Sequence, residues 1–393
     1  MALIVSLFLG LTVSAEEIFR DRKILKRESF LNLSRSSYLL SKIVILFVIS
    51  AIQAFSFIII ANSILGLKGM YMHYWFVLFS TAAFANMLGL NVSASFNSAV
   101  TIYILIPLLM IPMMILSGAM FSFDKLNRKV SSVGKVPVIA EFMVTKWAYE
   151  ALMVHQFKDN EYKKNLFELE KIESTADFKT VHLIPGLRDR LEDALMEFLT
   201  GKGIKDTEDN VYLLRNEIEK ELRNVPEVGF EHAENITPEN FSRNMADAIT
   251  QYLNDLEMHY RGTFQDAVQK KEYLINYWLD KSREKYFHIM DTYDNESVSD
   301  IVKKVYEKNP VVEYDNELTQ QIHPIYQDPV VKGFFDFRSH FFAPRKHFAG
   351  KYYDTYWFNV MFIWLLTFGL YATLYFELLK RLLNLGSQFK RKK

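Results

Sequence analysis

Four long apolar stretches stand out along the chain, and the segments between them differ strongly in polarity. Three lie close together, at 41–65, 74–94 and 98–123, and the fourth is at 356–376. Each holds the roughly 20 residues that an α-helix needs to cross a bilayer. Between the third and the fourth, hydrophobic residues are dispersed among many Lys, Glu and Asp. The pattern predicts an all-α, polytopic membrane protein with a large helical insertion before its last transmembrane helix.

The start of the chain is also apolar, but Glu16 and Glu17 interrupt it after 15 residues. No basic leader precedes this stretch and a basic segment follows it, which argues against a signal peptide. We interpret 1–15 as the second half of a transmembrane helix whose first half is missing. The chain is therefore expected to be truncated at its N-terminus.

Two basic clusters predict the orientation. Segment 16–42 holds seven basic and four acidic residues, and the tail from Lys380 to Lys393 holds six basic residues and no acidic one. The positive-inside rule places both clusters, and hence the C-terminus, in the cytoplasm. Alternation of the spans then puts 124–355 outside the cytoplasm. We expect a multi-pass protein of a bacterial inner membrane.

The insertion has helical periodicity. In 187–199, apolar residues at spacings of three and four define one face. A further helix is expected to begin at Pro238, with Thr237 as its N-cap. We predict no hairpin in this region, and the Pro- and Gly-containing stretch after residue 309 is expected to be irregular chain leading back to the last span.

These patterns predict seven consecutive segments with distinct roles. They are a partial transmembrane helix (1–15), a cytoplasmic helix (16–40), three transmembrane helices (41–123), external re-entrant or amphipathic helices (124–158), an extracytoplasmic helical domain (159–350), the last transmembrane helix (351–380) and a basic cytoplasmic tail (381–393).

Composition and motifs exclude several functions. The formal net charge is zero and there is no cysteine, so neither a nucleic-acid partner nor a cysteine-based site is expected. The sequence contains no GxxxxGK[ST] phosphate loop and no HExxH or GxSxG motif. We therefore expect no enzymatic activity, no metal and no cofactor in this chain.

Polar residues and prolines within the apolar stretches are candidate functional positions. An amide in hydrocarbon is costly unless it is paired. These side chains either hydrogen-bond neighbouring helices or line the path of a transported substrate. The prolines are expected to bend their helix or open its hydrogen-bond ladder. The candidates are Gln53, Asn86, Asn91, Thr101, Pro107 and Pro112.

The order of several short motifs resembles a known family. SRSSYLLSK leads into the span that ends ILGL, a later span ends ILSGAMFSF, and the amphipathic VPVIAEFMVTKWAYEALMVHQFKDN follows. This series resembles the permease domain of type-2 ABC transporters, in particular the white–brown (ABCG) subfamily, over about residues 1–158 and 352–380. The chain departs from the subfamily because its nucleotide-binding domain and first span are missing and its external loop is much longer.

The resemblance implies a mechanism. Two permease copies, as a homodimer or heterodimer, would form a path that exports an unknown substrate. ATP and Mg²⁺ would bind to a cytoplasmic ABC nucleotide-binding domain, either cut from this chain or separate. Segment 16–40 would be the coupling helix against that ATPase, with a passive basic anchor as the alternative. The residues implied in coupling are Arg22, Lys26, Arg27 and Glu28.

A second class of function stays open. The size of the insertion also fits a membrane-anchored sensor or scaffold whose extracytoplasmic helical domain binds a ligand or a partner. Deleting that domain would abolish signalling or assembly in such a protein, with no substrate transport to measure.

Overall fold

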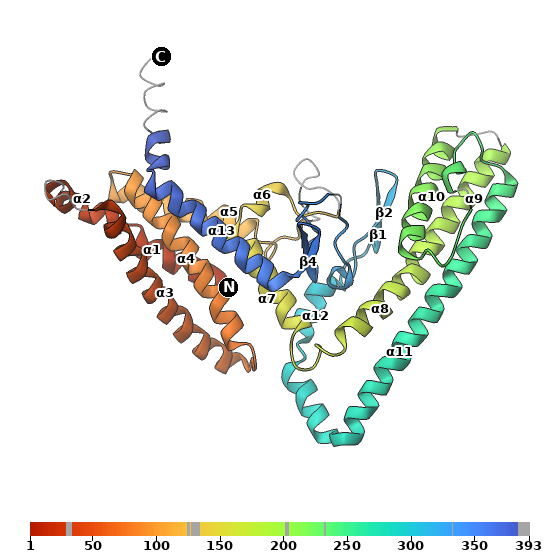
Figure 1. Cartoon of the computed structure of the whole chain (residues 1–393), viewed down its shortest axis with the longest axis horizontal. Helices are drawn as coiled ribbons and strands as arrows, with labels where there is room; N and C mark the ends of the chain where they lie inside the picture. Colours follow the sequence, from red (N-terminus) through yellow and green to blue (C-terminus); the bar gives the residue numbers. More distant parts are fainter. Residues whose placement is uncertain are drawn as a thin grey trace, which may run out of the picture. The chain divides into compact units, whose positions relative to one another are not determined.

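The computed structural model describes residues 1–28, 34–123, 126, 134–200, 204–231, 233–331 and 333–383. The described residues are mainly helical, with four short strands, so the all-α prediction is confirmed. The chain divides into two compact units, coloured by residue number in Figure 1. Unit 1 comprises Met1–Asn160, Pro329–Phe341 and Arg345–Lys393, and unit 2 comprises Glu161–Asp328 and Phe342–Pro344.

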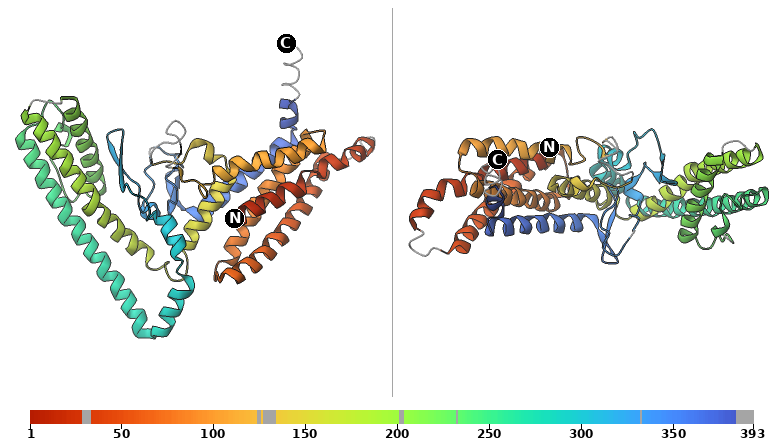
Figure 2. Two further views of the ribbon diagram at one scale, coloured as in Figure 1. Left: turned by 180° about the vertical axis from the view of Figure 1, so that it is seen from behind. Right: turned by 90° about the horizontal axis from the view of Figure 1, so that it is seen from above.

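Unit 1 contains the membrane helices. Among its described residues, four helical stretches are long and apolar enough to cross a bilayer, as a polytopic membrane protein requires. The first, Ala2–Ile24, is longer than the predicted segment 1–15 because it continues past Glu16. The helices are α1 (Ala2–Ser14), α2 (Glu17–Glu28), α3 (Arg35–Leu65), α4 (Tyr71–Ser95) and α13 (Thr355–Tyr375). α4 packs against α1, α3 and α13, as Figures 1 and 2 show.

One predicted span is shorter than expected. α5 covers Ala99–Ile115, only 17 residues, so the predicted end at Phe123 is wrong. The chain turns at Gly118, whose φ of +77° lies in the left-handed region that favours glycine. A Cβ at this position would lie 2.6 Å from ring atoms of Phe341. The backbone conformation of Gly118 and its close packing therefore both favour a turn here, and the helix does not continue to the end of the apolar run.

α1 and α4 approach each other closely because glycines lie between them. A Cβ added to Gly10 would lie 2.7 Å from the carbonyl oxygen of Ala82, and one added to Gly89 would lie 2.0 Å from Ser14 Oγ. Small residues at helix interfaces let backbones pack closely in membranes, where no hydrophobic effect drives helices together. Gly89 is thus required by its neighbours and not by its own backbone angles.

We expect the substitution Gly89→Ala to lower the free energy of unfolding by about 1–3 kcal/mol, because the added methyl group must displace α1. Chemical unfolding of the purified chain in detergent micelles measures this. Gly369→Ala in α13 is the matched control, because a Cβ there meets nothing within 4 Å. Equal losses in both variants would show that the close approach of α1 and α4 is not the cause.

The remainder of unit 1 consists of two short helices, α6 (Val138–Glu141) and α7 (Val144–Lys158), and an antiparallel hairpin. The hairpin joins β3 (Arg345–Phe348) to β4 (Lys351–Asp354). Its two loop residues, Ala349 and Gly350, have φ values of 51° and 75°, as expected for a tight two-residue turn. Four-residue strands are too short for alternation to predict them.

Unit 2 is a separate helical body. Its long helices run alongside one another in Figures 1 and 2, and contacts join α8 to α11, α9 to α10 and α9 to α11. The elements are α8 (Phe167–Phe178), a π-helical turn (Lys179–Leu183), α9 (Ile184–Thr200), α10 (Ile204–Asn224), α11 (Arg243–Tyr293), α12 (Glu296–Lys303), β1 (Val311–Tyr314) and β2 (Glu317–Gln320), with single 3-10 turns at Ala233–Asn235 and Pro324–Tyr326.

β1 and β2 form a second hairpin, so the prediction that the insertion lacks one is wrong. Its loop residues are Asp315 and Asn316, and both have a φ of 55°. Asp and Asn tolerate this left-handed conformation better than other non-glycine residues. The Asp-Asn pair is therefore the feature of the sequence from which this turn could have been predicted.

The core of unit 2 confirms the predicted helix face in 187–199. Leu187, Leu191 and Ala194 of α9 are buried in it. Phe198, on the same face, is 48% exposed at the end of the helix. Its ring nevertheless meets the edge of Phe241, 5.9 Å away between ring centres.

The start of α11 differs from the prediction. The helix begins at Arg243, and Ser242 caps it by accepting a hydrogen bond from the Met245 amide. Thr237 instead begins a turn in which its carbonyl accepts from the Asn240 amide at 3.1 Å. The prediction of an N-cap at Thr237 is therefore wrong. Pro fits a turn as well as a first helical position, and here the turn is formed.

Candidate functional site

The α2 helix is fixed to the C-terminal end of α4. The Arg22 guanidinium donates hydrogen bonds to the carbonyls of Ser93 at 3.0 Å and Ala94 at 2.8 Å, and also to the Asn97 side chain. The Ser93 hydroxyl in turn accepts from the amides of Ile18 and Phe19. Carbonyls at a helix C-terminus lack intrahelical partners and attract cations. Arg22 is thus used to position α2.

A second contact fixes α2 to α3. The Lys42 ammonium lies 2.7 Å from Glu17 and 2.8 Å from Asp21, so it bridges two carboxylates of α2. The Tyr38 hydroxyl donates to the same Asp21 carboxylate at 3.1 Å. Two of the acidic residues in this basic segment therefore bind internal partners.

The remaining side of α2 carries an exposed basic stripe. Four exposed residues follow each other at i, i+3, i+4 and i+7, which places them on one helix face. They are Arg20, Lys23, Ile24 and Arg27. Two of the residues implied in coupling can be compared. Arg27 lies on the exposed face of α2, whereas the Arg22 side chain contacts the end of α4. The side chains of Lys26 and Glu28 are outside the described residues, so their predicted role is untouched.

Two candidate amides hydrogen-bond neighbouring helices. The buried Asn86 amide donates to Ser50 Oγ of α3 at 2.8 Å. The buried Asn91 amide donates to the Leu370 carbonyl of α13 at 2.9 Å, and its oxygen accepts from Thr373. These contacts favour the helix–helix interpretation for both residues, because each satisfies a buried amide.

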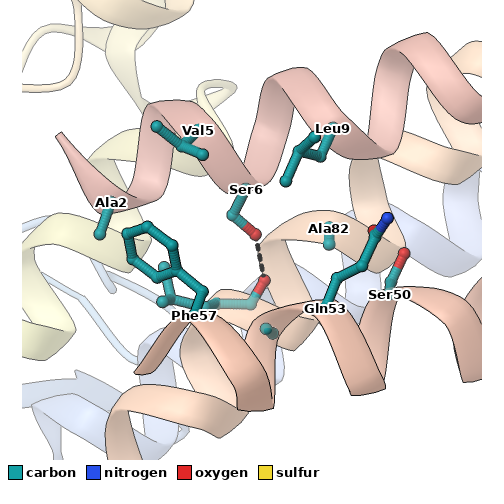
Figure 3. Close-up of a pocket in the computed structure, with 10 residues that line it drawn as sticks. Ala2, Val5, Ser6, Leu9, Ser50, Gln53, Phe57 and Ala82 are labelled. Atoms are coloured by element: carbon teal, nitrogen blue, oxygen red, sulfur yellow. Dashed lines mark hydrogen bonds between the residues drawn. The ribbon is translucent and has the colours of Figure 1, made fainter. Parts of the chain in front are cut away.

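Gln53 lies in a different environment. It lines a pocket between α1, α3 and α4, together with Ser6, Phe57 and other residues shown in Figure 3. The Ser6 hydroxyl is used, because it donates to the Leu78 carbonyl at 2.7 Å. Among the residues that the structure describes, none hydrogen-bonds the Gln53 amide. Gln53 is therefore the candidate path residue whose amide lines a small pocket without a hydrogen-bond partner among the described residues.

The candidates on α5 do not join this pocket. Thr101, Pro107 and Pro112 are exposed on a helix that continues through both prolines. Much of the surface around them is apolar, including Ile104 and Leu108. This face suits lipid or another protein helix, and the predicted flexing at the prolines stays a prediction.

Unit 1 also contains a buried ion-pair network that the sequence analysis missed. Lys346 of β3 donates to Glu150 of α7 at 2.6 Å and to the Ser339 hydroxyl at 2.7 Å. Lys146 lies 3.0 Å from Glu141 and 3.4 Å from the second oxygen of Glu150. Lys146 and Lys346 are 1% exposed at the side chain and Glu150 is fully buried. Two cations and two carboxylates balance each other here, and we call this group the Glu150 network.

The last membrane helix joins the Glu150 network through Asn359. Its amide donates to the Glu150 carboxylate at 3.0 Å and to the Trp147 carbonyl at 3.1 Å. The Lys146 ammonium lies 3.5 Å from the centre of the Trp147 ring, within cation–π range. Three segments therefore meet at the Glu150 carboxylate, namely α7, the hairpin and α13. α6 joins them through the contact of Glu141 with Lys146.

The charges in the Glu150 network alter its titration. Burial by itself would raise the pKa of Glu150, but the ammonium groups of Lys146 and Lys346 outweigh burial and hold that pKa below its usual value. Burial lowers the pKa of Lys346 to about 8, with the Glu150 carboxylate acting in the opposite direction. Glu150 therefore stays ionised at neutral pH, and the ion pair is kept.

The Glu150 network holds α6, α7, the hairpin and α13 in position relative to one another. Each of its charged groups is paired with another charged group. Across the part of the chain that the structure describes, no group of three or more His, Asp or Glu side chains is placed to hold a metal ion. The sequence signal that pointed to the network was the presence of Lys146 and Glu150, one turn apart, within an otherwise apolar amphipathic segment.

Comparison with known proteins identifies the first part of the chain. Residues 1–157 match the family described as ABC-2 type transporter. Neither a curated protein nor a solved structure matches the chain. The match covers α1 to α5 and nearly all of α7, so the fixed α2 helix, the Gln53 pocket and the α7 side of the Glu150 network all lie within an ABC-2 membrane domain.

Proposed function

We propose that this chain, whose residues 1–157 form an ABC-2 type transporter membrane domain, is the permease of an ATP-driven exporter that works as a dimer. The family assignment supports a permease subunit associated with an ABC ATPase and with lipid. Export, dimerisation and the docking surface are the parts that the proposal adds. The proposal also keeps the white–brown (ABCG) subfamily, which the order of the motifs resembles.

The observation that carries the proposal is the presentation of α2. Arg22 and Lys42 fix this helix to α4 and α3, while Arg20, Lys23, Ile24 and Arg27 face outward. A helix that is fixed on two sides and exposes a basic stripe with one apolar residue suits a protein partner of complementary charge. We propose that this stripe docks on the ATPase, which binds ATP and Mg²⁺.

The proposed topology follows from the same surface. With α2 and the basic C-terminal tail in the cytoplasm, residues 124–355 lie outside it, in a bacterial inner membrane. On this view this chain carries out no ATP hydrolysis itself and depends on a partner domain, either from a longer version of the chain or from a separate subunit.

Charge reversal on the exposed stripe tests the proposal. We expect the double variant Lys23→Glu/Arg27→Glu to reduce the ATP-hydrolysing activity that copurifies with the tagged chain by about tenfold or more. Mass spectrometry identifies the captured protein by a GxxxxGK[ST] phosphate loop. Lys68→Glu, at an exposed lysine in the α3–α4 connection, is the control and should leave the activity unchanged.

Membrane insertion of each variant must be equal for this comparison. If Lys23→Glu/Arg27→Glu retained full ATPase activity while inserting normally, docking at the stripe would be disproved. Arg22→Ala gives a different signature, because it removes the α4 contact and should also lower the stability of the chain.

Unit 2 supports the second candidate function, a sensor or scaffold. It has a hydrophobic core of its own, built from α8 to α11. Deleting 161–328 separates the two functions. A transporter should keep ATPase binding at α2, whereas a sensor should lose its activity without any transport to measure.

A further inference from the structure

Aromatic rings cluster on and beside the hairpin of unit 1. Phe334 and Phe335 are 61% and 67% exposed, and Phe348 and Tyr353 are 40% and 42% exposed. Phe335 lies 5.8 Å from Phe348, and Phe358 lies 6.4 Å from both Phe348 and Tyr353 between ring centres. We call these five residues the aromatic patch. Such an apolar surface is unfavourable in water and is typical of an interaction site.

The aromatic patch is directly joined to a membrane helix. β4 ends at Asp354 and α13 begins at Thr355, with no loop between them. The Asp354 carboxylate caps α13 by accepting from the Tyr356 amide at 2.9 Å. The hairpin therefore adjoins the N-terminal end of α13 directly.

The patch also continues an apolar stripe on α13. Phe358 belongs to the patch, and Met361, Leu365 and Phe368 follow it at i+3, i+7 and i+10. These three side chains are 71%, 63% and 64% exposed, as expected of a helix face in contact with lipid. The exposed apolar stripe of α13 thus continues through Phe358 onto the rings of the hairpin.

The hairpin is held in a fixed orientation by one contact in β3 and another at its turn. Lys346 of β3 is anchored to Glu150, and Phe334 packs on the turn, 3.1 Å from where a Cβ of Gly350 would lie. Lys351, paired with Phe348 across the hairpin, is exposed beside the rings. Aromatic rings next to a lysine are typical of the membrane–water interface, where the rings lie at headgroup level and the ammonium reaches phosphate.

From this arrangement we propose that the aromatic patch docks into the bilayer, in the interfacial layer at the N-terminal end of α13. Its partner is the lipid surface itself, contacted by the rings at the level of the first acyl carbons. The proposal rests on α13 spanning the membrane and not on transport, so it stands or falls separately from the proposed export function.

Site-directed spin labelling tests this directly, because the chain contains no cysteine. Single-cysteine variants Phe335→Cys and Phe348→Cys of the full chain are labelled and reconstituted into phosphatidylcholine–phosphatidylglycerol vesicles. Two collision rates are measured for each label, one with oxygen, which concentrates in the bilayer, and one with a water-soluble nickel chelate. A label at Met361→Cys on α13 gives the reference rates for a site in lipid. A label at Tyr273→Cys, where Tyr273 of unit 2 is 72% exposed, gives the reference rates for a site in water.

We expect both patch labels to favour oxygen over nickel, at values between the two limits and nearer to Met361→Cys. Nickel-dominated collisions like those of Tyr273→Cys would place the patch in water and overturn the proposal. Low accessibility to both reagents would show that protein covers the patch, either a second copy or another subunit, and would equally overturn it. A Met361→Cys label that faces water would instead reject the assignment of α13 as a span.

Discussion

Replacing Glu150 by Gln is expected to lower the free energy of unfolding by about 3–5 kcal/mol, because it breaks a buried ion pair and leaves the other partner charged. Glu150 is fully buried, and it is the carboxylate that Lys346 contacts. In Glu150→Gln, two buried ammonium groups face the single carboxylate of Glu141. Denaturant titration in detergent micelles, followed by tryptophan fluorescence, measures the loss, and Trp147 lies beside the Glu150 network as a local reporter.

A charge-balanced double variant is the decisive control. Glu150→Gln/Lys346→Met removes one charge of each sign and leaves the Lys146–Glu141 pair intact. Neutral replacement of a complete buried ion pair is often close to neutral for stability. The double variant should therefore be more stable than Glu150→Gln. If the two were equally unstable, uncompensated charge would not be the cause.

The same network predicts a pH dependence. The pKa of Lys346 is about 8 in the folded chain, below the 10.5 of a lysine exposed to water. Between these values the unfolded chain binds more protons than the folded one, so stability should rise with pH across this window. Lys346→Met should remove that rise, whereas a rise that persists in Lys346→Met would assign it to another group.

The second large effect is expected in the core of unit 2. Leu256→Ala should destabilise the segment 161–328 by about 2–5 kcal/mol, because it opens a cavity in a closely packed core. Leu256 of α11 is completely buried in the hydrophobic core of unit 2. Cooperative thermal unfolding of this segment, expressed without the membrane helices and followed by circular dichroism, provides the measurement.

Met258→Ala is the matched control for the core of unit 2. Met258 lies two residues further along the same helix and is 69% exposed. Its truncation should change stability by less than about 0.5 kcal/mol. A segment 161–328 that showed no cooperative transition even without substitutions would contradict the conclusion that unit 2 has an independent core.

Hydrophobic periodicity was sufficient to predict the general architecture. The uninterrupted apolar runs predicted α3, α4 and α13, since only helices satisfy their own backbone in a bilayer. The spacing of Leu187, Leu191 and Ala194 likewise predicted a buried helix face. Such predictions succeed because one local pattern carries the whole signal.

The failures arose where distant residues decide the outcome. Glu150, Lys346 and Asn359 meet in space but are far apart in the sequence, and no local pattern pairs them. Arg22 was expected to contact an ATPase, yet the end of α4 supplies carbonyl acceptors for it. Strands of four residues gave too little alternation to distinguish a hairpin from irregular chain.

The attachment of α4 at both of its ends has a mechanical consequence. Arg22 connects α2 to the last carbonyls of α4, and the Tyr356 hydroxyl at the start of α13 donates to the His73 carbonyl near the opposite end. At 1.5 Å per residue, this 25-residue helix is about 37 Å long. Its side chains are mostly buried from Val77 to Ser93, so bending it would disturb close packing along its length. We therefore expect a displacement of α2 to move α4 as a rigid rod, carrying the motion to the start of α13 with little loss in amplitude.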